Sequence, residues 1–106
     1  MTYQIRRVDR NQNLVVKKFR ALGCKVAILS SVGQGMCDLL VMVPPKLMPT
    51  RRPVLALVEV KDGSKPPSAR KLTDCEAKFH EEWRGCVFII NSEEEAEDLV
   101  KILEEP

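Results

Sequence analysis

Three stretches of this chain place apolar side chains at the spacing of an α-helix. The helices that this spacing predicts cover residues 9–22, 74–83 and 93–104. The residues expected to cap them are Asp9 for the first, Thr73 with Glu76 for the second, and Ser92 with Glu95 for the third. The faces expected to point inward hold Val8, Gln12, Val15, Phe19 and Leu22; Cys75, Phe79 and Trp83; and Ala96, Leu99, Val100 and Leu103.

Short apolar runs between these helices are typical of strands, and they cover residues 25–30, 38–43, 54–61 and 86–90. The last run is wholly apolar, so we expect it at the centre of a sheet, covered on both faces. The order α-β-β-β-α-β-α predicts an α/β fold with a mixed central sheet flanked by helices. A length of 106 residues supports a single domain over residues 1–106.

Acidic residues stand at matched ends of the second and third predicted strands. If Val43 pairs with Val54 in an antiparallel hairpin, Asp38 falls opposite Glu59, with Cβ atoms ~5 Å apart. Side chains alternate along a strand, so Lys61 shares the face of Glu59. Two facing carboxylates could bind Mg²⁺ or Mn²⁺. The lysine could orient or deprotonate a water and balance the negative charge of a phosphate. The alternative is an ordinary strand end, with a terminating Asp and a solvated Glu-x-Lys.

Charge is divided unevenly along the chain. Residues 1–71 hold 14 Lys or Arg against 4 Asp or Glu, and residues 72–106 hold 3 against 11. A basic surface around an acidic metal pocket suits an enzyme that cleaves nucleic acid. The candidate phosphate contacts are Lys65, Arg70 and Lys71 in the loop 62–72, and Arg51 and Arg52 in the segment 44–53. The alternatives are a solvated loop and charges that pair within the fold.

Four further polar residues are auxiliary candidates for this site. Gln12 interrupts an apolar stripe, and Asp9 opens the same helix. Glu76 could serve the site, although capping alone explains it. His80 titrates near neutrality, but it could equally be a packed imidazole.

The cysteines Cys24, Cys37, Cys75 and Cys86 form no Cys-x-x-Cys pair. A zinc site would need ligands from distant elements, with His80 as the only histidine, so we expect reduced thiols, several of them in the core. The Gly33-x-Gly35 pair is too weak to predict a phosphate loop, and we expect no nucleotide cofactor. No apolar run approaches ~20 residues, so we expect no membrane span. The basic N-terminus lacks the apolar region of a signal peptide.

An ordered series of motifs extends over roughly residues 5–103. It consists of Val-Asp-Arg-Asn-Gln at 8–12, Val-Gly-Gln-Gly at 32–35, Asp-Leu-Leu-Val at 38–41, Glu-Val-Lys-Asp-Gly at 59–63, Pro-Pro-Ser at 66–68, Arg-Lys-Leu-Thr at 70–73 and Phe-His-Glu-Glu-Trp at 79–83. This series resembles stand-alone VRR-NUC domains of phage and prophage origin, and its acids and lysine resemble the PD-(D/E)XK nuclease core.

The resemblance implies a restriction-endonuclease-like core and a Mg²⁺- or Mn²⁺-dependent endodeoxyribonuclease. By resemblance, Asp38, Glu59 and the backbone carbonyl of Val60 would hold the metal, and Lys61 would position the attacking water. It also implies branched DNA, with four-way (Holliday) junctions as the leading substrate. Symmetric cutting needs two active sites, so we expect a homodimer. The sequence does not identify its surface, for which the first helix and residues 44–53 are candidates. The expected location is the cytoplasm, that of the host if the chain is phage-encoded.

Two departures from the family pattern concern the site. Cys37 stands where relatives often have Pro before the first acid. Many relatives carry a glutamate in the first helix, whereas residues 10–22 hold no acid, which leaves Asp9, Asn11 or Gln12. The rival functions are a non-catalytic DNA-binding or phage assembly adaptor, and an end- or nick-directed nuclease within a larger machine.

Overall fold

The computed structural model describes residues 10–45 and 52–105, so Asp9, Val8 and Arg51 lie outside the described residues. The elements run α1 (Arg10–Ala21), β1 (Lys25–Ile28), β2 (Leu39–Val43), β3 (Val54–Val60), η1 (Pro67–Arg70), α2 (Asp74–Glu82), β4 (Val87–Ile90) and α3 (Glu93–Glu104). The predicted order of helices and strands is confirmed. The short 3₁₀ turn η1 lies within the predicted loop 62–72.

The strands form one mixed sheet in the order β1-β2-β3-β4. The β2–β3 hairpin is antiparallel with Val43 opposite Val54, which is the predicted register. β3 and β4 are parallel because α2 connects them. The prediction of a central fourth strand is wrong, since β4 lies at the sheet edge and its Ile89 is 44% exposed. Its apolar sequence reflects the inward packing of Ile90 rather than cover on both faces.

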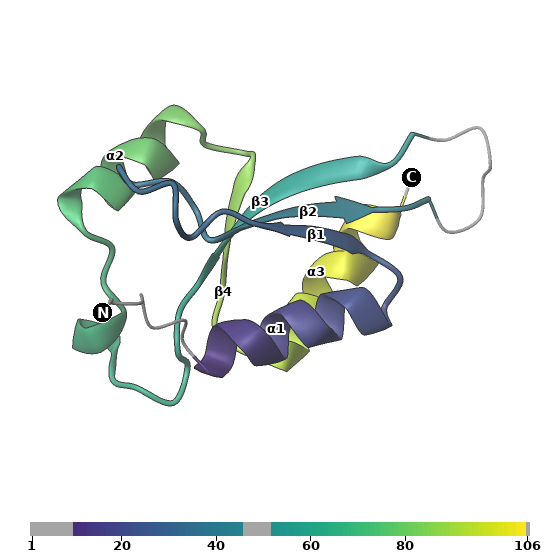
Figure 1. The fold of residues 1–106 in the computed structure, drawn as a ribbon, viewed down its shortest axis with the longest axis horizontal. Coiled ribbons are helices and arrows are strands. Elements are labelled where there is room, and N and C mark those ends of the chain that lie inside the picture. The colour runs from purple at the N-terminus through teal and green to yellow at the C-terminus, as the bar shows by residue number, and fades with distance from the viewer. Residues whose placement is uncertain (1–9, 46–51, 106) are drawn as a thin grey trace, which may run out of the picture.

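The helices α1 and α3 lie side by side on one face of the sheet (Figure 1). Between helices and sheet lies the core, formed by Val15, Val16, Phe19, Cys24, Leu39, Val41, Val43, Val58, Val60, Ile90, Ala96, Leu99 and Val100. This arrangement confirms the predicted inward face of the last helix and, for the described residues, that of the first. At the start of α3, Ser92 accepts a hydrogen bond from the Glu95 amide, but Glu95 Oε1 accepts from the Asn91 amide instead of completing the predicted box.

The second helix differs from its prediction. α2 lies apart from α1 and α3, toward the end of the sheet where β3 ends (Figure 1). Each of its residues is at least partly exposed, so the expected buried stripe is wrong. Phe79 and Trp83 stack on each other with ring centroids 5.3 Å apart, and Trp83 is 49% exposed. The helically spaced Phe79 and Trp83 therefore form a pair of rings at the surface, because α2 packs against few other residues.

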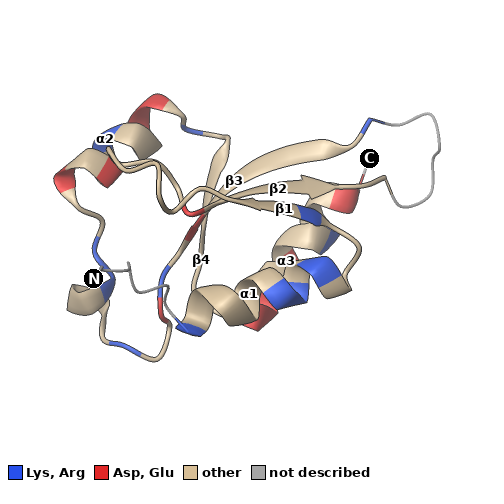
Figure 2. Cartoon of the chain, viewed as in Figure 1, with Lys and Arg blue, Asp and Glu red and all other residues tan. Residues whose placement is uncertain are grey.

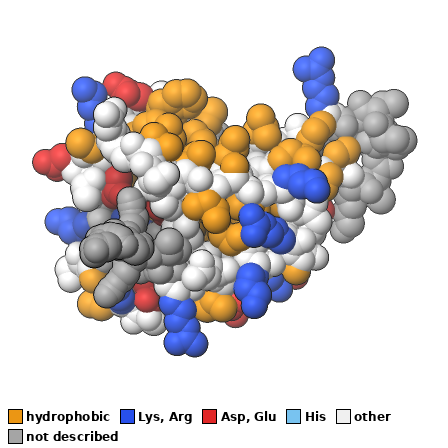
Figure 3. Space-filling model, in the orientation of Figure 1, with side chains coloured by type: hydrophobic (Ala, Val, Ile, Leu, Met, Phe, Trp, Pro, Cys, Tyr) orange, Lys and Arg blue, Asp and Glu red, His pale blue; other side chains and the backbone are white. Residues whose placement is uncertain are grey.

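Hydrophobic side chains gather in the upper part of the space-filling view, above the strands (Figure 3). Leu55 on β3 and Ile89 on β4 are among those exposed. Contiguous exposed apolar surface is typical of an interaction face. Of the four cysteines, all free, Cys24 and Cys37 are buried and Cys75 and Cys86 are exposed. Among the described residues, no helix has the length and apolarity needed to cross a membrane.

Candidate active site

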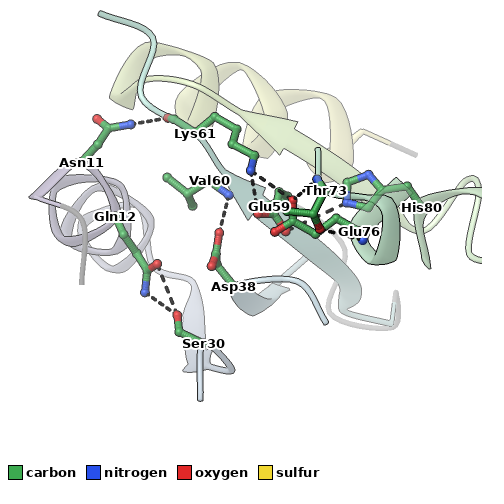
Figure 4. A network of polar contacts seen from close by, with 10 residues as sticks. All are labelled: Asn11, Gln12, Ser30, Asp38, Glu59, Val60, Lys61, Thr73, Glu76 and His80. Carbon is green, nitrogen blue, oxygen red and sulfur yellow. Dashed lines mark hydrogen bonds and ion pairs between the residues drawn. The ribbon is translucent and has the colours of Figure 1, made fainter. Parts of the chain in front are cut away.

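The sheet brings Asp38, Glu59 and Lys61 to one end of the β2–β3 hairpin (Figure 4). Asp38 precedes β2, while Glu59 and Lys61 stand at the end of β3. Because Val58 and Val60 point into the core, the alternation of the strand turns Glu59 to the opposite face. There Glu59 is only 2% exposed. The hairpin thus places an acid on an otherwise apolar strand, away from bulk water.

Burial and mutual repulsion disfavour charge on both acids. Asp38 Oδ2 accepts a hydrogen bond of 2.8 Å from the Val60 amide. Burial raises the pKa of Asp38, an effect that this amide partly offsets. Burial and the nearby Asp38 carboxylate raise the pKa of Glu59 to about 8. A protonated Glu59 can then donate a hydrogen bond to Asp38.

Lys61 supplies the positive charge of this cluster. Its Nζ lies 3.6 Å from Glu59 Oε2 and 3.2 Å from Glu76 Oε1. Burial works against the charged form, but the two carboxylates prevail and raise the pKa of Lys61. The side chain is therefore an ammonium held between two acids, suited to binding an anion rather than to accepting a proton.

Glu76 combines two roles that the sequence presented as alternatives. Its Oε1 accepts from the Thr73 amide, which completes the capping box of α2, and it also accepts from Lys61 Nζ. Burial opposes ionisation, but these hydrogen bonds lower the pKa of Glu76. The same helix brings His80 Nε2 to 4.0 Å from Glu59 Oε1. Both auxiliary candidates from α2 thus lie at the site.

The two amides of the first turn of α1 differ in where they point. Gln12 is buried, and its side-chain amide both donates to and accepts from the hydroxyl of Ser30, which follows β1 (Figure 4). These hydrogen bonds do not involve the acids. Asn11 Nδ2 donates to the carbonyl of Lys61 at 2.5 Å and to that of Asn91 at 3.2 Å. Asn11 therefore braces the chain where β3 ends, a role that helical periodicity could not reveal.

The candidate phosphate contacts separate into two places. Lys65 and Lys71 are exposed in the loop that joins Lys61 to α2, and Arg70 Nε donates to the Lys65 carbonyl at 2.8 Å. Arg52 precedes the far end of β3, and at ~3.3 Å per strand residue it lies roughly 30 Å from Lys61. A single DNA duplex would have to extend over several base pairs to contact both places.

Acidic residues concentrate along α2 and α3, and basic ones along the C-terminal half of α1 (Figure 2). Lys18 of α1 and Glu97 of α3 form an ion pair of 3.6 Å. The basic and acidic parts of the chain therefore pair in part within the fold. Among the described residues, Lys65 and Lys71 of the loop 62–72 add exposed basic groups near the site.

Gly35 lets α2 approach the strand end. It adopts φ of 82°, and a Cβ there would stand 2.5 Å from the carbonyl oxygen of Cys75, in the first turn of α2. Gly33 has φ of 78°, but a Cβ there would meet nothing within 4 Å. The turn before Asp38 therefore sets the position of the helix that carries Glu76 and His80.

We expect Gly35→Ala to destabilise the fold by about 2 kcal/mol, and Gly33→Ala by about 1 kcal/mol. Both replacements carry the strain of a left-handed backbone, but only the first drives a methyl group into the backbone of α2. Urea unfolding of both variants measures the difference. Equal losses in the two variants would contradict a close contact between Gly35 and Cys75.

The residues at the hairpin end fit a hard divalent cation. Asp38, Glu59 and Glu76 offer carboxylate oxygens, whereas among the described residues Lys61 is the one ammonium in contact with Glu59 and Glu76. Among the described residues, Glu59 Oε1 is buried without a hydrogen-bond partner. A cation that takes oxygen ligands would balance the charge of these acids.

Comparison with known proteins identifies the family. A solved structure described as a VRR_NUC domain is 32% identical in sequence, with a TM-score of 0.56 over 87% of this chain and 91% of that chain. No family model matches the chain, and no curated protein matches it. The mixed sheet flanked by helices agrees with the PD-(D/E)XK-like fold expected from the sequence. The chain belongs to the VRR_NUC family of nuclease-type domains.

Proposed function

We propose that this chain is a Mg²⁺- or Mn²⁺-dependent endonuclease that hydrolyses phosphodiester bonds in DNA. The observation that carries the proposal is the meeting of Asp38, Glu59 and Lys61 at one end of the hairpin. A structural strand end has no need to bury Glu59 beside another carboxyl, because burial of paired acids costs stability.

Each residue has a distinct role in this proposal. Asp38, Glu59 and the Val60 carbonyl would hold the metal, which when bound lowers the pKa of a water and polarises the phosphoryl oxygen. The Lys61 ammonium binds the phosphate and stabilises the charge that develops on it. Glu76 fixes the direction of the Lys61 side chain, and Asn11 fixes its backbone.

The proposed substrate is branched DNA, with four-way junctions first. Lys65 and Lys71, exposed beside the site, can hold backbone phosphates of any sequence, which suits a substrate recognised by its shape. Paired cuts in a four-way junction need two active sites, so the proposal includes a homodimer. The exposed apolar side chains of the sheet provide surface for such an association.

The test compares a labelled four-way junction with a linear duplex of the same sequence, each with Mg²⁺, Mn²⁺ or a chelator. We expect paired, metal-dependent nicks in the junction and little cutting of the duplex. Light scattering on the same preparation measures whether the active species has the mass of two chains.

Other outcomes reject parts of the proposal. Equal cutting of both DNAs would remove junction selectivity but keep the nuclease. Cutting confined to ends or nicks would indicate a nuclease that works within a larger machine. Binding without cutting in either metal would reject the enzyme and favour a DNA-binding adaptor.

A further inference from the structure

Three different donor atoms meet beside Glu59. Cys37 comes from the turn before β2, Glu59 from β3 and His80 from α2. The Cys37 sulfur, a Glu59 carboxylate oxygen and a His80 ring nitrogen all lie within 4.8 Å of one another. The sequence argued against such a site because these residues are far apart along the chain, but the fold of the hairpin under α2 gathers them.

Two of these donors lack partners within the part of the chain that the structure describes. Glu59 Oε1 and His80 Nε2 are both buried without a hydrogen bond. They face each other at 4.0 Å, which is too far for a hydrogen bond. An unsatisfied buried polar group costs about 1–3 kcal/mol. A group bound between them would relieve this cost.

We propose that Cys37, Glu59 and His80 bind a divalent transition-metal ion of the zinc type. Sulfur and imidazole donors select Zn²⁺ or Co²⁺, whereas Mg²⁺ prefers oxygen ligands alone. Three protein ligands leave a fourth tetrahedral position for water. At Zn–N and Zn–O distances of about 2 Å, the two facing atoms would stand roughly 3.3 Å apart, so their 4.0 Å separation would contract by about 0.7 Å on binding.

Charge supports the same assignment. Cys37 is fully buried beside Glu59 and His80. Binding of the ion through the Cys37 sulfur and the Glu59 carboxylate replaces the protons that these groups carry, which are released to solvent. A thiolate and a carboxylate then neutralise the two charges of the ion, which makes a buried site electrically balanced.

The two oxygens of Glu59 face different neighbours. Oε2 lies 3.6 Å from Lys61 Nζ, and Oε1 lies 4.0 Å from His80 Nε2. An ion on Oε1 places positive charge next to the carboxyls that would hold Mg²⁺. We therefore expect zinc to weaken Mg²⁺ binding and to inhibit cleavage, a consequence that rests on the proposed function, whereas the binding itself does not.

The test is titration of the purified chain with Co²⁺, a spectroscopic substitute for Zn²⁺. Cys75→Ser and Cys86→Ser are introduced first, because these exposed thiols could bind cobalt on their own. We expect one ion per chain, a near-ultraviolet sulfur-to-cobalt charge-transfer band, release of at least one proton and displacement of cobalt by zinc. In this background Cys37→Ser should remove the band, and His80→Gln should weaken binding at least tenfold.

Circular dichroism shows which variants are folded, and His80→Gln keeps the test decisive if Cys37→Ser does not fold. A cobalt affinity unchanged by His80→Gln, or a sulfur band that persists in folded Cys37→Ser, would overturn the proposal. Because the readout is spectroscopic, a chain that cuts no DNA could still bind cobalt here. A chain that cuts junctions with Mg²⁺ could equally fail to bind cobalt, so the two proposals fail separately.

Discussion

Asp38→Asn is expected to reduce metal-dependent cleavage about a thousandfold, the scale of losing one group that stabilises charge in a transition state. The asparagine side-chain oxygen can still accept the hydrogen bond from the Val60 amide, which is 2.8 Å long in the wild type. The change therefore removes a charge and a metal ligand but keeps the contact between the turn and β3. Single-turnover cleavage of a labelled junction measures the loss.

The matched control is Asp62→Asn. Asp62 Oδ1 accepts hydrogen bonds from the Ser64 amide at 2.9 Å and the Ser64 hydroxyl at 2.7 Å, both of which an asparagine oxygen can accept. This acid follows Lys61 directly but faces the loop, so its replacement should change cleavage less than threefold. A similar loss in both variants would mean that cleavage depends on general charge near the loop and not on a ligand at position 38.

The hairpin could be predicted from the sequence because two constraints agree on it. Apolar alternation fixes which face of each strand is buried, and a one-residue slip would expose every core side chain of β2. The pairing of Val43 with Val54 then determines that Asp38 and Glu59 meet. The acid pair was accessible to sequence reasoning because local pattern alone determines its geometry.

The surroundings of the acids could not be predicted in the same way. The position of α2 depends on the approach of Gly35 to the Cys75 backbone, a contact between residues forty positions apart. Periodicity assigned Phe79 and Trp83 to a core, but they stack on the surface. The same tertiary contact brings His80 over Glu59 and next to Cys37. Local sequence patterns do not indicate that these three side chains come together.

Glu59 is the residue through which these features are connected. It is paired with Asp38 through the register of the hairpin, with Lys61 through strand alternation, and with His80 through the placement of α2. Its burial disfavours the charged form, and each proposed ion would restore that form. The unfolding free energy of the metal-free protein should therefore depend on pH through the Glu59 carboxyl.

In the presence of a chelator, the unfolding free energy of the wild type is expected to fall between pH 5 and pH 8. Relative to Glu59→Gln, the fall should be on the order of 3 kcal/mol. Burial and Asp38 raise the pKa of Glu59 from 4.5 to about 8 in the folded state. Between these values the folded protein keeps a proton that the unfolded chain has released. The stabilisation is thus complete below pH 4.5 and is lost as the pH rises through about 8. Urea unfolding at intervals across this range measures the effect.

Glu82→Gln serves as the control, because it removes an exposed carboxyl of α2 and should leave the wild-type pH dependence unchanged. Glu59→Gln cannot ionise, so its stability should vary less with pH and exceed that of the wild type at pH 8. Addition of Mg²⁺ or Mn²⁺ at pH 8 should narrow the gap, since an ion bound to the ionised carboxyl stabilises only the folded wild type. Parallel pH profiles for wild type and Glu59→Gln would show that Glu59 is already charged in the metal-free fold, and the argument for a cation from its burial would then fail.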